Sequence, residues 1–261
     1  VQTCALPISY GQTAEESQRF GLPCGGSVQV VLEPLSVKSE LRGLLASIVS
    51  YQRVKRRLDM ATGTVRHEHA QDGDRVQFDG ATLNTVFGPR LRLLIIGGGQ
   101  LSRYLASMAS MLDYQITVCE PRDEYHESWD ELPHVTLSTQ MPDDLVLAMN
   151  LDHNSAVVAV THDPKLDDLA LMEALRTPAF YVGALGSRLN NARRRDRLLE
   201  FDVSPAEAEK LRGPVGLNLG ALTQPEIAMS IVAEMTAIRR GVDLRLPLTN
   251  WDGSKTVCAT S

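Results

Sequence analysis

The sequence has few cysteines, no excess of positive charge and no long apolar run, and each shortage excludes a class of protein. Its four cysteines among 261 residues are too few and too scattered for a disulfide framework, and no pair has the spacing of zinc ligands. The net charge of −6 argues against a nucleic-acid-binding face, because phosphate binding requires clustered lysine and arginine. No apolar run approaches the ~20 residues that span a bilayer, and the first residues lack the basic-then-apolar order of a secretion signal. We therefore expect a globular, cytoplasmic protein.

The sequence does contain enough apolar material for one large or two ordinary domains, with 43% hydrophobic and 22% charged residues. Its most informative stretch begins with an apolar run, Leu93–Ile96, that ends at Gly97, Gly98 and Gly99. From Gln100 onward the apolar residues follow a helical period. This order predicts a strand, a tight turn and a helix.

A second apolar run, Ile116–Cys119, ends at Glu120, which lies 21 residues after Gly99. At about this distance a dinucleotide-binding unit places the carboxylate that accepts a hydrogen bond from a ribose hydroxyl. Glycines let a pyrophosphate approach the backbone, and the N-terminus of the following helix favours its negative charge. Glu120 favours an unphosphorylated ribose, as in NAD, and Arg122 partly offsets this preference. We predict a Rossmann-type unit with NAD or another dinucleotide as its ligand, although the same turn can serve packing alone.

Alternating strand and helix patterns continue to about residue 241 and predict a doubly wound parallel sheet over residues 91–241. Further strands are expected at 135–138, 155–160, 179–185 and 214–220. Further helices are expected at 142–150, 166–176, 190–201, 204–213 and 223–240. The basic run Arg193–Arg195 is interpreted as the solvated side of one of these helices. Residues 242–261 show no strong pattern and are interpreted as a tail.

Residues 1–88 predict a smaller α+β region. Residues 1–9 begin without methionine and show neither an apolar period nor a turn pattern, so we interpret them as non-native sequence. A strand is expected at 28–32, a helix at 38–53 and an antiparallel meander from 54 to about 87. So few elements cannot bury one another well, which indicates an incomplete N-terminal domain.

Polar residues follow two further strands at the edge where ligands bind in doubly wound sheets. His162 and Asp163 come after one strand, and Gly186, Ser187 and Arg188 come after the next. His162 and Asp163 are candidates for ligand contacts or proton transfer; alternatively, they end the strand and cap the next helix. Arg188 is a candidate anion clamp, and a surface ion pair is the alternative.

Cys24 is the candidate reactive residue. It lies in a Pro-Cys-Gly-Gly turn, where exposed backbone amides can stabilise a thiolate that faces a ligand. A lone cysteine more often has a structural role, which is the alternative for Cys24. Cys119 lies within an expected buried strand and is interpreted as a core residue.

Six segments over residues 20–241 form a recognisable set: GLPCGGSVQVVLEPL, LLIIGGGQLSRYLA, ITVCEPR, VVAVTHD, FYVGALGSRLNNARR and GLNLGALTQPEIAMSIVAEM. Together they resemble the XdhC/CoxI family of molybdenum-hydroxylase maturation factors. The resemblance implies a C-terminal Rossmann domain from about residue 91 behind a separate N-terminal domain. It also implies a protein that binds the molybdenum cofactor (molybdopterin) and protects it while a cysteine desulfurase supports installation of a terminal sulfur. The cofactor is then inserted into a xanthine dehydrogenase-type molybdoenzyme.

The chain departs from the family pattern at several positions. Gln100 stands where family members commonly have histidine, which removes one candidate ligand contact, and Glu120 stands where they have aspartate. The Gly-Ser-x-Pro-Arg stretch and the Gly-Gly-Cys-x-Glu turn of the family's N-terminal domain are both missing from this sequence. The chain therefore resembles a fragment that starts partway through that domain. Cys24 matches the cysteine of the family's Pro-Cys-Gly-Gly turn.

The leading hypothesis is a maturation chaperone rather than an enzyme. Its cargo, a pterin phosphate or pterin dinucleotide, is held through phosphates at the glycine turn, with Cys24 near the metal-bearing end. We also expect a homo-oligomer. The alternatives are an NAD(P)-dependent oxidoreductase, for which the sequence offers no well-placed proton donor near the expected nicotinamide, and a scaffold that senses a bound nucleotide.

Overall fold

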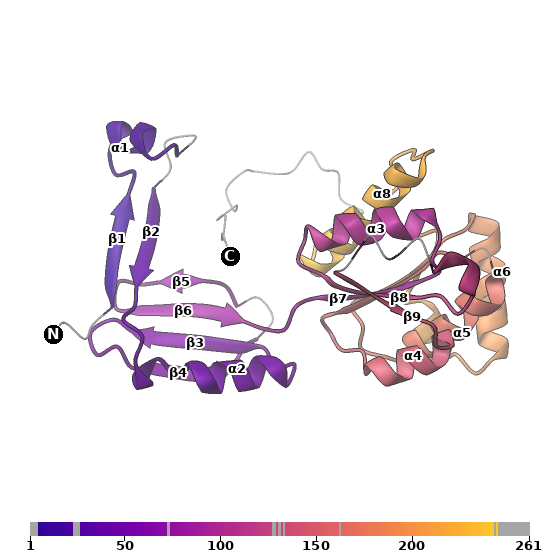
Figure 1. Ribbon diagram of the computed structural model, residues 1–261, viewed down its shortest axis with the longest axis horizontal. Coiled ribbons are helices and arrows are strands. Elements are labelled where there is room, and N and C mark those ends of the chain that lie inside the picture. Colours follow the sequence, from indigo (N-terminus) through magenta and orange to yellow (C-terminus); the bar gives the residue numbers. More distant parts are fainter. Residues whose placement is uncertain are drawn as a thin grey trace. The chain divides into compact units, whose positions relative to one another are not determined.

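The computed structural model describes residues 5–22, 27–71, 74–126, 129, 132, 134–161, 163–242 and 244. The chain divides into two compact units, one that extends to Pro89 and one that begins at Arg90. Each unit has its own sheets and its own hydrophobic core (Figure 1). The predicted fold class, a Rossmann-like α/β domain that follows a smaller α+β region, is confirmed.

The first unit contains a four-stranded antiparallel sheet and a separate two-stranded ribbon. Its elements are β1 (Leu6–Tyr10), α1 (Ala14–Arg19), β2 (Val28–Leu32), η2 (Val37–Ser39), α2 (Leu41–Val49), β3 (Val54–Asp59), β4 (Val65–His69), β5 (Gln77–Phe78) and β6 (Thr82–Phe87). The strands of the larger sheet are antiparallel, as predicted, but their order is β4-β3-β6-β5 rather than that of a meander. Two hairpins therefore pair through β3 and β6.

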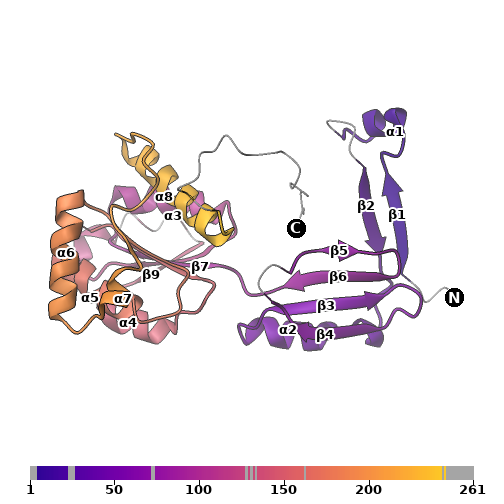
Figure 2. The same cartoon turned by 180° about the vertical axis from the view of Figure 1, so that it is seen from behind.

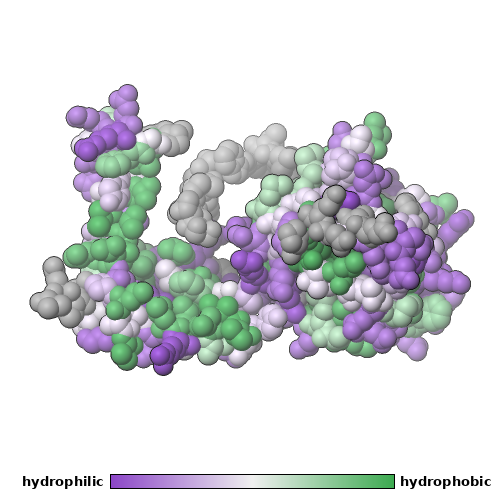
Figure 3. All heavy atoms as spheres, in the orientation of Figure 1, coloured by the Kyte–Doolittle hydropathy of each residue, from purple (hydrophilic) through white to green (hydrophobic). Residues whose placement is uncertain are grey.

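The ribbon of β1 and β2 contains a strand that the sequence pattern did not indicate. Leu6–Tyr10 is a strand that pairs antiparallel with β2 along its whole length, so that Ile8 lies opposite Val30. Pairing with a distant strand, rather than any local turn pattern, determines this element. Apolar side chains on one face of the ribbon remain exposed, and Figure 3 shows them in green along it.

The second unit is a doubly wound α/β domain. Its elements are β7 (Arg92–Ile96), α3 (Gln100–Ser110), β8 (Gln115–Cys119), η3 (Asp123–Tyr125), β9 (Val135–Ser138), α4 (Pro142–Met149), β10 (Ser155–Ala159), α5 (Pro164–Ala174), β11 (Tyr181–Ala184), α6 (Arg188–Glu200), α7 (Pro205–Ala208), β12 (Leu211–Arg212) and α8 (Gln224–Arg239). The six strands are parallel in the order β12-β11-β10-β7-β8-β9. The strand order reverses between β7 and β10, and ligands bind beside such a switch point in open α/β sheets.

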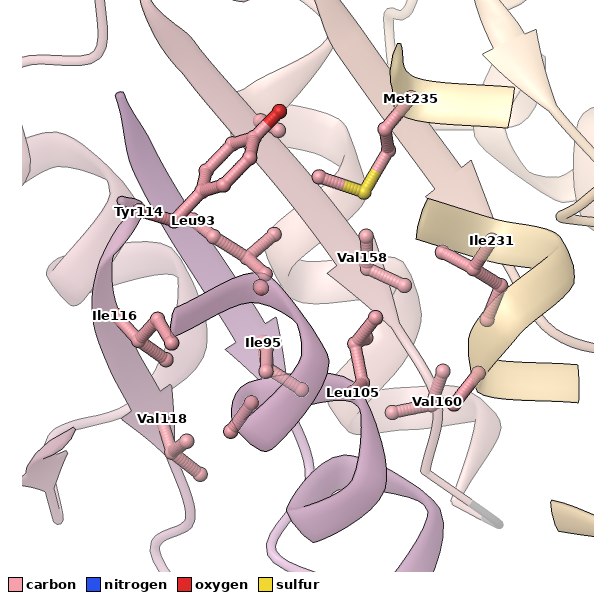
Figure 4. Close-up of a cluster of buried hydrophobic side chains, with 14 of the residues drawn as sticks. Leu93, Ile95, Leu105, Tyr114, Ile116, Val118, Val158, Val160, Ile231 and Met235 are labelled. Atoms are coloured by element: carbon pink, nitrogen blue, oxygen red, sulfur yellow. The ribbon is translucent and has the colours of Figure 1, made fainter. Parts of the chain in front are cut away.

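Helices cover both faces of this sheet, with α3 and α8 on one face and α4, α5 and α6 on the other (Figures 1 and 2). Successive side chains of β7 point to opposite faces of the sheet and pack into two different hydrophobic clusters. Leu93 and Ile95 belong to one cluster, and Leu94 and Ile96 belong to the other. Figure 4 shows the first cluster, in which side chains from the strands meet Leu105 of α3 together with residues of α8. This packing holds the carboxyl edge of the sheet in place.

The sixth strand is not where the sequence pattern predicts it. Leu211–Arg212 forms β12, whereas the predicted segment 214–220 is not a strand. The segment runs from the sheet to α8 instead, because the Val215 amide donates to the Ala184 carbonyl of β11 and the Leu217 amide donates to the Ser230 carbonyl. Gly216 and Gly220 adopt positive φ angles of 92° and 69°, which a regular strand does not allow.

Among the helices of the described residues, none is long and apolar enough to cross a membrane.

Candidate functional site

The loops singled out from the sequence lie at one edge of the sheet. Ile96, Ala159 and Ala184 are the last residues of β7, β10 and β11, and they lie opposite one another in the parallel register. The described residues that follow these strands, at 97–99, at 161 and 163, and at 186–188, therefore leave the sheet at the same edge. Cys119, at the end of β8, also lies opposite Ile96. The arrangement fulfils the geometric condition for a shared site, while the role of each residue stays a prediction.

The three glycines of the turn have different surroundings. Gly97 has a φ of 108°, and a Cβ there would lie 2.9 Å from Cγ2 of Thr161. A Cβ on Gly98 would lie 2.9 Å from Cγ of Glu120 and 3.1 Å from Nε1 of Trp129. A Cβ on Gly99 would meet nothing within 4 Å. Only Gly99 therefore faces open space.

Gly99 precedes the first residue of α3, Gln100, and no side chain caps this helix. Beside it lies a cavity of 570 Å³, lined by Gly98, Gly99, Gln100, Arg103, Tyr104, Ser107, Glu124, Tyr125 and Leu132, which we call the turn cavity. In the same first turn, Ser102 is buried and its hydroxyl has no hydrogen-bond partner in the part of the chain that the structure describes. Unpaired amides at a helix N-terminus favour an anion. The turn cavity, whose lining contains both Arg103 and Glu124, is thus a candidate site for a phosphate group.

Glu120 is fully buried, with 0% of its surface exposed. Its Oε2 accepts hydrogen bonds from the Gly98 amide at 2.8 Å and from Nη2 of Arg122 at 2.8 Å. Its Oε1 accepts from Nε of Arg122 at 2.7 Å and from the Arg122 amide at 3.1 Å. Burial disfavours the charged carboxylate, but the hydrogen bonds from Arg122 and Gly98 outweigh this effect and hold the pKa of Glu120 below its ordinary value.

Two described residues after β8, Trp129 and Tyr125, contact the glycine turn and Arg122. The indole Nε1–H of Trp129 donates to the Gly98 carbonyl at 3.1 Å, and Trp129 is only 4% exposed. The guanidinium of Arg122 lies over the ring of Tyr125, with 4.6 Å between its Cζ and the ring centroid. No signal in the sequence indicates that Trp129 reaches the turn, because the contact spans 31 positions.

Asp163 caps the helix that follows β10. Its side chain accepts a hydrogen bond from the Lys165 amide at 2.9 Å, as in the capping alternative stated for the sequence. Its backbone amide and carbonyl both contact the hydroxyl of Thr161. His162 lies outside the described residues.

Ser187 is the N-cap of α6 and accepts a hydrogen bond from the Asn190 amide at 3.1 Å. Arg188, the first residue of α6, is exposed, and Gly186 has a φ of 136°. The interpretation of Arg193–Arg195 as a solvated helix side holds for Arg193, which is exposed, but is wrong for Arg194, which is buried; Arg195 is partly buried. The inward positions of α6 are Asn191, Arg194 and Leu198, which follow the helical period.

Arg194 is 5% exposed and binds two acidic residues of α5. Its Nη2 lies 2.9 Å from Oδ2 of Asp167, and its Nε lies 3.2 Å from Oδ1 of Asp168. Its Nη1 donates to the Leu185 carbonyl and to the side chain of Asn191. Arg194 therefore ties α5 and α6 to the end of β11.

A second cavity, of 330 Å³, lies between the starts of α5 and α6 and is called the arginine cavity. Its lining comprises Thr161, Pro164, Asp167, Leu185, Gly186, Asn190, Arg193, Arg194 and Arg197. Arg193 is exposed and makes no ion pair with any described residue. The sequence analysis missed Arg193 and Arg197 as site residues, although their spacing of one helical turn was a usable signal.

The pH dependence of folding stability tests the burial of Asp167 in this network. Burial raises the pKa of Asp167 from 3.8 to about 6, although hydrogen bonds from Thr161 and the charge of Arg194 act in the opposite direction. A raised pKa in the fold means that the stabilising contribution is complete below the unfolded value and is lost as the pH rises through about 6.

We therefore expect the wild type, relative to Asp167→Asn, to be more stable at pH 5 than at pH 7 by about 1 kcal/mol. Urea unfolding of both proteins at the two pH values measures this difference. Asn serves as the reference because it does not titrate. A difference between the two proteins that does not change with pH would contradict the raised pKa of Asp167.

The structure tests the prediction for Cys119 but not the one for Cys24. Cys24 lies outside the described residues. Cys119 is a buried core residue, as predicted, and its thiol donates to the Gln140 carbonyl at 3.4 Å. Burial and the nearby carboxylates raise the pKa of Cys119 to about 12, which excludes a reactive thiolate at neutral pH.

The strand order, the glycine turn at the switch point and the polar loops at the same edge define a Rossmann-type domain. The model of the XdhC Rossmann domain matches residues 93–235. The chain belongs to the XdhC family, in agreement with the resemblance noted in its sequence.

Two curated relatives extend the comparison. The molybdenum cofactor insertion chaperone PaoD of Escherichia coli is 26% identical over 218 residues, which cover 84% of this chain and 61% of PaoD. A probable xanthine dehydrogenase subunit of Bacillus subtilis is 30% identical over 154 residues, which cover 59% of this chain and 44% of that protein. The chain thus spans about half the length of these two relatives.

A crystal structure of a xanthine dehydrogenase from Bacillus halodurans has a similar fold. The TM-score is 0.70 at 21% identity, and the match covers 94% of this chain and 78% of that chain. At this level of identity the similarity concerns the fold alone.

Proposed function

We propose that this protein is a maturation factor that carries the molybdenum cofactor and delivers it to a xanthine dehydrogenase-type molybdoenzyme. The proposal rests on membership of the XdhC family and on the name of the relative PaoD, a molybdenum cofactor insertion chaperone. The observation that carries it in the structure is the opening at Gly99, next to the uncapped start of α3. A pterin cofactor bears phosphate, and this opening supplies what a phosphate requires.

The site supports binding of cargo better than catalysis. Described polar groups at the sheet edge are engaged in structural contacts: Asp163 and Ser187 cap helices, and Glu120 is enclosed by Arg122. No group of three or more potential metal ligands occurs among the described residues. We propose that phosphates are held at the turn, with Gly186 and Arg188 at the same edge. NAD is the alternative ligand, and turnover of NADH with a small carbonyl substrate would favour an oxidoreductase.

The finer parts of the proposal concern sulfuration and Cys24. A cysteine desulfurase supplies the terminal sulfur while the cofactor is bound, and the thiol of Cys24 contributes to retention of the cofactor. These roles come from the match of Cys24 to the cysteine of the family's Pro-Cys-Gly-Gly turn. We also propose that residues 1–88 are part of a larger N-terminal domain and that the protein is a homo-oligomer.

The test is the cargo itself. Full-length protein purified with a co-expressed molybdenum hydroxylase is expected to contain molybdopterin and to restore sulfurated enzyme in a deletion strain. Cys24→Ala is expected to lower cofactor retention, whereas Cys119→Ala, which removes a buried thiol, leaves retention unchanged. Protein without molybdopterin that also fails to restore the enzyme would refute the function, and equal retention in both variants would refute the role of Cys24.

A further inference from the structure

We propose that the turn accepts the phosphate of a ligand without a nucleoside, because the chain's own Arg122 occupies the carboxylate that a Rossmann domain offers to the ribose of a nucleoside. The inference rests on the proposed function in taking the molybdenum cofactor as the ligand. It specifies the form of that cargo as a pterin monophosphate rather than a pterin dinucleotide.

The first step concerns the ribose. A dinucleotide-binding domain presents a free carboxylate after its second strand, and this carboxylate accepts hydrogen bonds from ribose hydroxyls. In this chain the corresponding residue, Glu120, already accepts four hydrogen bonds, three of which come from Arg122. Both carboxylate oxygens are therefore occupied from within the chain, and the side chain has no exposed surface.

The second step concerns the geometry of the hydrogen bonds from Arg122 to Glu120. Nε and Nη2 of Arg122 donate to the two different oxygens of Glu120, at 2.7 and 2.8 Å. These two parallel donors take the place that two adjacent ribose hydroxyls would occupy. Such charge-assisted, bidentate pairs are stronger than hydrogen bonds between neutral groups. A ribose therefore has to displace a stronger partner than itself.

The third step concerns the space beside the turn. Trp129 seals the gap between Gly98 and the carboxylate, since its indole Nε1–H donates to the Gly98 carbonyl. Even one added carbon on Gly98 would contact both Glu120 and Trp129 at about 3 Å. Because Trp129 and Glu120 fill this gap, a ribose next to Gly98 does not reach the Glu120 carboxylate. The turn cavity lies outside the gap, since its lining includes neither Glu120 nor Trp129.

The last step concerns what remains open. Gly99 and the start of α3 are free of protein atoms on their outer side, and the turn cavity adjoins them. On the other side of the switch point, the arginine cavity contains Arg193, which is free of any described acidic partner. Three arginines and one aspartate line the arginine cavity, so this opening favours negative charge and a cationic nicotinamide ring gains nothing from it. One arginine and one glutamate line the turn cavity, where the amides at the start of α3 favour an anion. A phosphomonoester therefore meets its requirements at the turn, whereas the ribose of a dinucleotide meets no free carboxylate at the end of β8.

The test compares ligands with and without the nucleoside, by calorimetric titration of the 261-residue chain with inorganic phosphate, pyrophosphate, AMP and ADP-ribose. We expect phosphate and pyrophosphate to bind saturably and the adenosine to add less than ~3-fold in affinity. A gain of ~10-fold or more for AMP over phosphate, or for ADP-ribose over pyrophosphate, would overturn the inference. Absence of phosphate and pyrophosphate binding would also overturn it.

A variant that frees Glu120 and opens the gap at Gly98 is expected to gain affinity for the nucleoside. Arg122→Ala combined with Trp129→Ala is expected to raise the affinity for ADP-ribose by ~10-fold or more, and Arg240→Ala, which removes one exposed positive charge elsewhere, is expected to change nothing. A folded double variant, judged by its thermal transition, that gains no affinity contradicts the inference. If the double variant does not fold, the wild-type titrations decide.

Mass spectrometry of cargo released from the full-length protein separates this inference from the proposed function. Molybdopterin without a nucleotide supports both. Molybdopterin released together with a nucleotide overturns the inference and leaves the carrier function intact. Protein that contains no pterin refutes the function, and the titrations still decide whether the turn accepts a nucleoside.

Discussion

Gly97→Ala is expected to lower the free energy of unfolding of the Rossmann unit by about 3 kcal/mol. The φ of 108° at Gly97 lies in a region that L-residues rarely adopt, so the new residue is strained in any surroundings. Its Cβ would also lie 2.9 Å from the side chain of Thr161 and 3.3 Å from the backbone of that residue. The backbone cannot yield without disturbing the start of α5. Urea unfolding, followed by circular dichroism, measures the loss.

Gly99→Ala is the matched control in the same turn. Its φ of −73° is ordinary and a Cβ there would enter open space, so the stability is expected to change by less than ~0.5 kcal/mol. Because the added methyl group would occupy the opening beside α3, phosphate affinity is expected to fall by ~10-fold. Equal stability losses in the two variants would contradict this division between a structural glycine and a binding glycine.

Arg194→Met is expected to destabilise the same unit by about 4 kcal/mol, since removal of one partner leaves a buried charge uncompensated. Arg194 is the buried cation that both Asp167 and Asp168 contact, and its guanidinium also donates to the Leu185 carbonyl. Methionine fills a similar volume without any donor. Chemical unfolding again measures the change, and a loss below ~1 kcal/mol would show that the network does not need this charge.

Arg193→Met, one residue earlier in α6, separates the buried charge from the exposed one. Arg193 is exposed and has no described ion-pair partner, so its substitution is expected to change stability by less than ~0.5 kcal/mol. If the arginine cavity attracts anions, phosphate affinity falls in this variant while the unfolding transition stays in place. The two neighbours therefore report on different properties of the helix.

The candidate site could be predicted only in part. The position of the glycine turn at the end of β7 follows from the apolar run Leu93–Ile96 and its abrupt end, because both are local patterns. The role of Arg194 could not be found, since a run of three arginines gives no sign of which one faces Asp167. Trp129 was missed for a similar reason, because only the folded loop brings its indole to Gly98.

The sequence by itself determined the architecture of the second unit, because strand and helix periods alternate along it and parallel strands with short connections allow few arrangements. It also determined the family, through motifs such as the one that contains Gly186 and Ser187. Only the tertiary structure decided which polar groups are available to a ligand. Whether Glu120 faces a ribose or Arg122 depends on distances between loops that meet at the sheet edge, and periodicity within one segment carries no information about such distances.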